Sequence, residues 1–443
     1  MKPSRRFLIM LVVLLACAML LGTLKALAVA LPEHLHTAWW GLGLALLVAA
    51  AIDALLAYRQ KPLRIERYLP GQLPLGRWSD IELKVHHAFP HEVLIELYDH
   101  VPCGMEQDAL PLKVLLKPGL TTQTHYRIRP LQRGAFIYPH CEVLTPSPFT
   151  LWQRRQRLEL HSETRVYPDF ARLYDSTPLA AEQWLGQLGV RQKPRRGLGQ
   201  DFHQLREFRE GDTLRQIDWK ATARKGVPIA REYQEERDQQ ILFLLDCSRH
   251  MRSQDGELTH FDQALDACLL LAHVALRQGD AVGLSTFAEE SPRHVAPGKG
   301  NRQLGVLLNT VYDLQPTLAP PDYSSAVRLL LTRQRRRALI VLVTNLKDEN
   351  DETLRLALDR LGTHHRVLIA SLREEILDTL VERDVHTYEE ALAYCGAVDY
   401  RNDRQTLHER LGHTGLTLID ALPGELGPAL VTRYLGWKKA GVL

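Results

Sequence analysis

Oxygen-bearing side chains follow two of the most apolar segments of the chain. Asp246 ends the segment ILFLLD, Ser248 stands two residues later and His250 two residues after that. Asn345 ends a second apolar segment, ALIVLVTN. Carboxylate, hydroxyl and amide oxygens suit Mg²⁺, whereas an imidazole nitrogen favours transition metals. Three hypotheses follow: a working Mg²⁺ site, a site for another metal recruited through His250, or an incomplete metal set. In the incomplete case, Asp246 caps the following loop or pairs with an arginine.

Strands that alternate with helices must position these residues. From Gln240 onward we expect strands at ILFLLD, AVGLSTFA, ALIVLVTN, RVLIASL and LTLIDAL, with helical stretches between them. Wholly apolar strands separated by helices predict an α/β doubly wound parallel sheet that is covered on both faces. Ligands of such sheets bind beyond the carboxyl ends of the strands, which is where Asp246 and Asn345 are placed.

A densely charged segment precedes this sheet. Many charged residues stand on both sides of a single tryptophan in this segment. The residues of interest are Arg206, Glu207, Gly211, Asp212, Arg215, Asp218, Trp219, Lys220, Arg224, Arg231, Glu232 and Glu236. Arginine forks pair well with carboxylates, so the pattern predicts a buried or interfacial ion-pair network. Because no nucleophile or metal anchor accompanies it, we expect no catalytic residues and no enzyme. The enzymatic alternative is a metal-dependent hydrolase that uses the carboxylates beside Lys220.

Residues 62 to about 160 have the pattern of a small antiparallel β sandwich. Short alternating or apolar runs such as IELKVHHAF and EVLIELYDHVP are separated by turn signals roughly every ten residues. Nothing in this region has catalytic spacing. Residues 161 to 240 are transitional, and within them LGVRQKPRRGLGQDFHQLREFREGD (188–212) is rich in Gly and charge, which predicts loop and short helix.

Two apolar runs at the N-terminus predict a membrane hairpin. Phe7–Leu24 and Ala38–Leu56 are each about long enough to cross ~30 Å of hydrocarbon. Lysines and arginines precede the first run and follow the second, while the connection at 32–37 has none. The positive-inside rule then places both termini and the soluble domains in the cytoplasm. A cleaved signal peptide ending at Ala28–Ala30 is the alternative, although the first run is long for one.

Net charge and cysteine content limit the classes of partner and of cysteine-based site that we expect. The formal net charge is only +3, so nucleic acid is not expected as a partner. The chain has six cysteines and no C-x-x-C pair, so neither a zinc site built on cysteines nor a disulfide framework is expected.

The charged segment closely resembles the signature of the bacterial domain-of-unknown-function family fifty-eight. The matching elements are LREFREGDTLRQIDWKATAR, REYQEERD and LLDCSRHM. The resemblance extends over most of the chain and implies a membrane hairpin over 1–60, a β-rich sandwich over 61–160 with an RGAF…SPFTL segment, the signature over 161–239, and an α/β domain over 240–443. Members of this kind are often associated with MoxR-type AAA+ ATPases, in systems thought to act in assembly.

The last domain looks like a von Willebrand factor A fold. That resemblance implies a metal-ion-dependent site built on Asp-x-Ser-x-Ser and a later Asp. Asp246 and Ser248 match the first two oxygens, but His250 replaces the second serine and Asn345 replaces the later carboxylate. Both replacements weaken the site for Mg²⁺.

Taken together, the sequence predicts a membrane-anchored, non-enzymatic interaction protein that partners a MoxR-type AAA+ ATPase at envelope complexes. A second alternative is a scaffold whose β sandwich binds peptide through an edge strand, or binds lipid.

Overall fold

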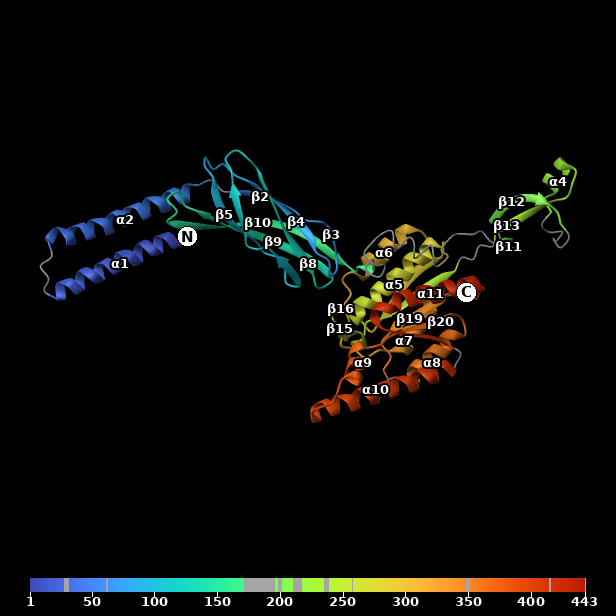
Figure 1. Cartoon of the computed structure of the whole chain (residues 1–443). Coiled ribbons are helices and arrows are strands. Elements are labelled where there is room, and N and C mark those ends of the chain that lie inside the picture. The colour runs from blue at the N-terminus through green and yellow to red at the C-terminus, as the bar shows by residue number, and fades with distance from the viewer. Residues whose placement is uncertain are drawn as a thin grey trace. The chain divides into compact units, whose positions relative to one another are not determined.

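The computed structural model describes residues 1–27, 32–60, 63–170, 196–197, 201–209, 217–234, 239–256, 258–347, 351–413 and 416–442. The chain divides into two compact units, Met1–Tyr167 and Pro168–Leu443. Each unit has its own sheets and its own buried core (Figure 1).

The first unit begins with two antiparallel apolar helices (Figure 1). Helix α1 covers Arg5–Ala26 and helix α2 covers Glu33–Arg59. Both are long and apolar enough to span a membrane, and the two predicted runs lie inside them. The Nε1 of Trp39 donates to the carbonyl of Leu14 at 3.0 Å and so links the helices. The cleavage site considered at Ala28–Ala30 lies outside the described residues.

Two β-sheets follow in the same unit. Their strands are β1 (Lys2–Pro3), β2 (Arg64–Tyr68), β3 (Gln72–Pro74), β4 (Ser79–His86), β5 (Val93–Asp99), β6 (Met105–Asp108), β7 (Leu112–Leu116), β8 (Thr122–Pro130), β9 (Gly134–Pro146) and β10 (Trp152–Tyr167). One sheet has the order β1-β10-β9-β5-β7, with β3 pairing β10, and the other has the order β2-β4-β8-β6. Alternate residues of β4, β5 and β9 are buried, as a half-buried strand requires. The pairing is antiparallel as predicted, except that β3 runs parallel to β10.

A buried ion pair joins the two sheets. The guanidinium of Arg67 on β2 donates to both carboxylate oxygens of Asp99 on β5. The hydroxyl of Tyr126 on β8 donates to the same carboxylate at 2.7 Å. Arg67 also donates to the carbonyl of Leu160 at 2.6 Å, near the irregularity in the β9–β10 pairing. Every oxygen of this buried carboxylate therefore has a donor, as burial demands.

The turn between β9 and β10 is fixed to the second apolar helix through Asp53. This carboxylate is fully buried and accepts from the hydroxyl of Ser147, from the amide of Phe149 at 2.9 Å and from the amide of Leu151 at 3.0 Å. We call Asp53 and residues 147–151 the anchor joint. The sequence offered no assigned role for Asp53, and the structure shows that it organises the SPFTL turn.

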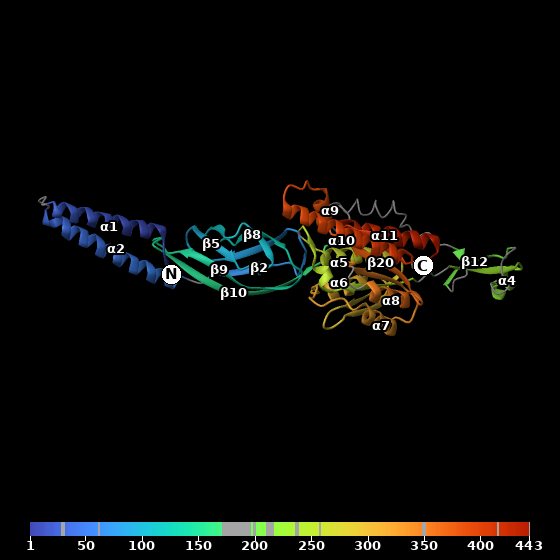
Figure 2. The same cartoon turned by 90° about the horizontal axis from the view of Figure 1, so that it is seen from below.

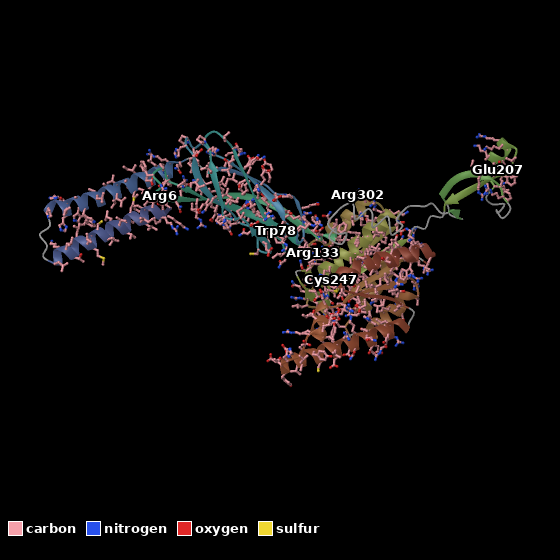
Figure 3. The ribbon with its side chains drawn as sticks, in the orientation of Figure 1. Arg6, Trp78, Arg133, Glu207, Cys247 and Arg302 are labelled. Carbon is pink, nitrogen blue, oxygen red and sulfur yellow. The ribbon has the colours of Figure 1, made fainter. Side chains whose placement is uncertain are left out.

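Further contacts surround the anchor joint. Trp152 Nε1 donates to the carbonyl of Ala50 at 2.9 Å, and Arg154 Nη1 donates to the carbonyls of Ala57 and Gln60 at the end of α2. Arg6, labelled in Figure 3, donates to the hydroxyl of Thr150 at 3.1 Å. A cation at a helix C-terminus satisfies carbonyls that have no partner within the helix.

The signature region forms a small module of one three-stranded sheet and one helix (Figure 1). Strand β11 (Arg196–Gly197), strand β12 (Asp201–Glu207) and strand β13 (Ile229–Gln234) form one antiparallel sheet in the order β11-β13-β12, and helix α4 covers Trp219–Lys225. The prediction of loop and short helix over 188–212 was therefore wrong for 201–207. The alternating patterns DFHQLRE and IAREYQ have strand period, which the high charge masked.

The α/β domain contains one mixed sheet. Its strands are β14 (Gln240–Asp246), β17 (Ala281–Phe287), β18 (His294–Gly298), β19 (Leu339–Thr344), β20 (Arg366–Leu372) and β21 (Thr417–Ala421), in the order β18-β17-β14-β19-β20-β21. All five predicted strands are present and parallel. The edge strand β18, which was not predicted, is antiparallel. A short two-stranded ribbon of β15 (Gln254–Asp255) and β16 (Leu258–Thr259) precedes the first helix of this domain.

Helices cover both faces of this sheet (Figure 2). The helices are α5 (His260–Arg277), α6 (Asn301–Val311), α7 (Tyr323–Arg333), α8 (Asp351–Gly362), α9 (Glu375–Glu382), α10 (Tyr388–His413) and α11 (Pro423–Ala440). Buried side chains of α5, α6 and α11 pack on one face, and those of α7, α8 and the second half of α10 pack on the other. The predicted two-sided cover of the sheet is observed.

Candidate functional site

The carboxyl ends of β14 and β19 form the candidate site, the strand-end site. These strands are parallel neighbours, with Leu245 opposite Val343. The strand order reverses at this point, because the next strand after β14 in the sequence lies on its other side. Asp246 and Thr344 consequently reach the same edge of the sheet, at the position where doubly wound folds bind ligands. Cys247, which follows Asp246, is labelled in Figure 3.

Asp246 is fully buried, and hydrogen bonds engage both of its oxygens. Oδ1 accepts from the amide of Ser248 at 2.8 Å, and Oδ2 accepts from the hydroxyl of Thr344 at 2.6 Å. Burial raises the pKa of Asp246, while the two donors and the nearby His250 act in the opposite direction. The carboxylate thus caps its own loop.

Ser248 and His250 belong to the same turn. The Ser248 hydroxyl accepts from the amide of His250 at 3.3 Å and caps a short 3₁₀ helix over Arg249–Arg252. The His250 side chain is buried. The structure therefore brings Asp246, Ser248 and His250 together in one capped turn.

Asn345 belongs to a different network. Its Nδ2 donates to Glu374 Oε1 at 2.6 Å, and its Oδ1 accepts from Arg404 Nη1 at 3.0 Å. Successive side chains of a strand point to opposite faces, which accounts for the separation of Thr344 from Asn345. The hydrogen bonds of Asn345 thus join it to Glu374 and Arg404, whereas those of Asp246 join it to Ser248 and Thr344.

Arg404 is the residue at this edge that the sequence reasoning missed. It comes from α10, is buried, and donates to Ser371 Oγ at 2.7 Å, to Asp420 Oδ1 at 2.6 Å and to the carbonyl of Leu346 at 2.9 Å. Burial disfavours its charge, but Asp420 and Glu374 outweigh that effect and raise the pKa of the guanidinium. No local motif marks Arg404, because its partners come from three different strand ends.

A second missed group adjoins Arg404. His260 Nε2 lies 2.7 Å from Asp255 Oδ2, and the same oxygen accepts from the amide of Glu375 at 3.1 Å. The hydroxyl of Tyr400 donates to Glu374 Oε1 at 3.3 Å. These contacts fasten α9 and α10 to the edge of the sheet.

The residues at this edge do not fit Mg²⁺. Asn345 Oδ1 faces the guanidinium of Arg404, so a fixed cation already occupies the direction from which a metal would be bound. Both Asp246 oxygens accept hydrogen bonds within the chain. Mg²⁺ demands near-octahedral oxygen ligands and usually retains several waters, which this closed arrangement does not provide.

The signature residues occupy the module around α4. Asp218 Oδ1 caps α4 by accepting from the amides of Lys220 and Ala221, each at 3.0 Å. Trp219 is 69% exposed, and Lys220 and Arg224 are also exposed. We predicted that the ion-pair network around Trp219 is either buried or interfacial. The buried alternative is wrong at Trp219, because this side chain of α4 is exposed to solvent. The interfacial form stays a prediction.

The remaining signature residues are placed as follows. Arg206 and Glu207 lie on β12, where Arg206 Nη1 donates to the carbonyl of Glu207 at 3.0 Å; Glu207 is labelled in Figure 3. Arg231 and Glu232 lie on β13, opposite Leu205 and Gln204. Four predicted residues lie outside the described residues: Gly211, Asp212, Arg215 and Glu236.

Comparison with protein families identifies this region. Residues 204–393 match the family described as "Protein of unknown function DUF58". We call residues 204–393 the DUF58 region. The DUF58 region covers the signature module from β12 onward and most of the α/β domain, including Asp246, Ser248, His250 and Asn345. The predicted family resemblance is confirmed.

Solved structures with similarity to the chain include a von Willebrand factor A domain. The SpRpn10 VWA domain is 13% identical, with a TM-score of 0.27, over 42% of this chain and 88% of that domain. An Escherichia coli α-2-macroglobulin fragment is 18% identical, with a TM-score of 0.19, over 25% of this chain. The chain spans 17% of that fragment and 7% of a Salmonella α-2-macroglobulin. A search of curated proteins finds no match.

Proposed function

We propose that the chain is a membrane-anchored, non-enzymatic interaction protein that docks a MoxR-type AAA+ ATPase on its DUF58 region. The two apolar helices are the anchor, both termini and the soluble domains face the cytoplasm of a bacterial inner membrane, and the complex serves assembly or maintenance of envelope complexes. The orientation rests on the basic residues Lys2, Arg5 and Arg6 before the apolar run Phe7–Leu24 and on Arg59 after the apolar run Ala38–Leu56. The ATPase partner rests on the family resemblance.

The strand-end site supports a binding role over catalysis. Its carboxylates and its amide are engaged by Ser248, Thr344 and Arg404, so it presents neither a nucleophile with a base nor an open metal position. An edge whose Asp246 and Asn345 side chains are held by hydrogen bonds within the chain suits a scaffold that holds α9 and α10 in place. Neither nucleic acid nor a small substrate is part of the proposal.

The exposure of Trp219 is the observation that carries the proposed docking surface. Trp219 stands on a capped helix, and Leu205 and Val227 of the same module are exposed as well. Lys220, Arg224 and Lys225 add positive charge to α4. Tryptophan flanked by basic residues is the composition of interface hot spots, because a large ring buries much apolar area at little entropic cost. We therefore assign the ATPase contact to α4 and its flanks.

Quantitative affinity purification from gently solubilised membranes tests this assignment. The wild type should recover an AAA+ ATPase, and Trp219→Ser should reduce recovery at least about tenfold, the effect of losing roughly 1.4 kcal/mol of binding energy. Leu356→Ser is the matched control, because Leu356 is a 63% exposed apolar residue on α8. Asp246→Ala tests the strand-end site in the same experiment.

The outcomes separate the possible contacts. Recovery that Leu356→Ser preserves and Trp219→Ser abolishes supports docking on α4. Recovery lost only with Asp246→Ala moves the contact to the strand-end site. A wild type that never recovers an ATPase removes the partner from the proposal.

A further inference from the structure

Two histidines and a glutamate converge on the outward face of the sandwich. His140 and Glu142 are alternate residues of β9, and His100 follows β5, the neighbouring strand. Because Asp99 pairs with Cys141 and both are buried, the residues on either side of them face outward together. The amide of His100 donates to the carbonyl of His140 at 3.3 Å, and the two rings lie 4.1 Å apart between centroids. Ligand atoms of all three residues lie within 4.8 Å of one another.

The spacing of two of these atoms is that of metal ligands and not of a hydrogen bond. His100 Nε2 lies 3.5 Å from Glu142 Oε1, and it makes no hydrogen bond with the described part of the chain. A direct hydrogen bond would bring such atoms to about 2.8 Å. Zinc–ligand bonds of about 2.0–2.1 Å at tetrahedral angles separate two ligand atoms by roughly 3.3 Å. The observed separation therefore leaves room for one small cation between them.

We propose that His100, His140 and Glu142 form a binding site for a divalent transition-metal ion of the Zn²⁺ class. Two imidazole nitrogens and one carboxylate oxygen exclude Mg²⁺ and Ca²⁺, which prefer oxygen ligands alone. Three protein ligands leave the fourth tetrahedral position for water or for a group from a partner. This site is separate from the strand-end site and does not depend on the proposed ATPase contact.

Two arginines of β10 contact the proposed metal ligands and would compete with the metal ion for them. Arg155 donates through Nε at 2.8 Å and Nη2 at 2.6 Å to the two oxygens of Glu142. Arg157 Nη2 lies 3.2 Å from His140 Nδ1. Both arginine side chains are exposed, so each can move into solvent when the ion binds. Their removal should therefore tighten binding, whereas a merely structural cluster would gain nothing.

Metal titration of the full-length protein in detergent, carrying no histidine tag and treated with chelator, tests the site. We expect one equivalent of Zn²⁺ to bind in competition with a chromophoric chelator. Co²⁺ in its place should give the intense visible absorption of four-coordinate cobalt. His100→Gln and His140→Gln should each weaken Zn²⁺ binding at least about 100-fold, since a lost ligand costs at least as much as a lost outer-shell partner. The double substitution of Arg155 and Arg157 by Gln should strengthen it several-fold.

Matched controls make the result specific. His125→Gln removes an exposed histidine of β8, and Cys103→Ser removes an exposed thiol of the same unit; both should leave Zn²⁺ affinity unchanged. Absence of stoichiometric binding, or binding that survives both histidine substitutions, overturns the proposal. If a histidine variant fails to fold, two measurements still test the site. Zn²⁺ affinity that is unchanged in the Arg155 and Arg157 double variant, together with a six-coordinate Co²⁺ spectrum of the wild type, would exclude it.

Discussion

At the scale of single residues, the strand-end site is governed by how burial acts on Asp246. Burial places its folded-state pKa above the ordinary value of 3.8. The folded protein then retains this proton at pH values where the unfolded chain has lost it, so the free energy of unfolding falls as pH rises from about 4 through the folded-state pKa. Above that pKa the penalty is constant.

We therefore predict that Asp246→Asn gains thermal stability over the wild type as pH rises. The amide can accept from Ser248 and donate to Thr344, whose hydroxyl can turn to Tyr323 Oη, 3.2 Å away. Thermal midpoints of the solubilised protein between pH 4 and about pH 8 check this. Asp322→Asn is the control of opposite sign, because hydrogen bonding from the amide of Ser325 lowers the pKa of Asp322. A difference for Asp246→Asn that shrinks with rising pH contradicts the prediction.

Arg404 carries the second prediction at this scale. Arg404→Met should lower the free energy of unfolding of the α/β domain by about 3–5 kcal/mol, because it removes the cation beside buried Glu374 and the donor to the buried Ser371 hydroxyl and Leu346 carbonyl. Arg401→Met, on an exposed position of the same helix, should change it by less than about 0.5 kcal/mol. Urea unfolding followed by circular dichroism measures both. Equal effects of the two substitutions would mean that the Arg404 network contributes nothing beyond helix propensity.

At the scale of elements, apolar strands were predictable and charged ones were not. ILFLLD and ALIVLVTN predicted β14 and β19 because strands buried on both faces admit few polar residues. β12 and β13 have charged residues at both odd and even positions, so the two-residue period of hydrophobic side chains that marks a strand is not visible in their sequence. Arg404 and Asn345, or His100 and His140, meet only through tertiary structure. For the proposed metal site, the sequence shows only that His140 and Glu142 are two residues apart, which places them on the same face of a strand.

The anchor joint gives a prediction about how α2 and the β9–β10 turn are coupled. Asp53→Ala should accelerate hydrogen exchange of the amides of Phe149 and Leu151 roughly 10–100-fold, since a hydrogen bond to a charged group contributes about 1.5–3 kcal/mol. Thr37→Ala is the control, because the Thr37 hydroxyl donates to the carbonyl of His34 within α2 itself. Unchanged exchange at both amides would show that the turn holds its shape without Asp53.

At the scale of the whole molecule, the decisive property is the side of the membrane on which the soluble domains lie. We propose that those domains lie in the cytoplasm, because basic residues flank the two apolar helices and translocating lysine and arginine is unfavourable. The native cysteines report on this directly. Cys103 in the sandwich and Cys395 on α10 are exposed, whereas Cys141, Cys247 and Cys268 are buried.

A membrane-impermeant maleimide should therefore leave Cys103 and Cys395 unmodified in intact spheroplasts and label both after permeabilisation. His34→Cys, at the start of α2 and on the opposite side of the bilayer, should react in intact spheroplasts and so proves that the reagent reaches the protein. Labelling of Cys103 and Cys395 without permeabilisation would place the DUF58 region outside the cytoplasm. A cytoplasmic ATPase could not then reach Trp219, so this one measurement bears on the anchor, the orientation and the proposed partner together.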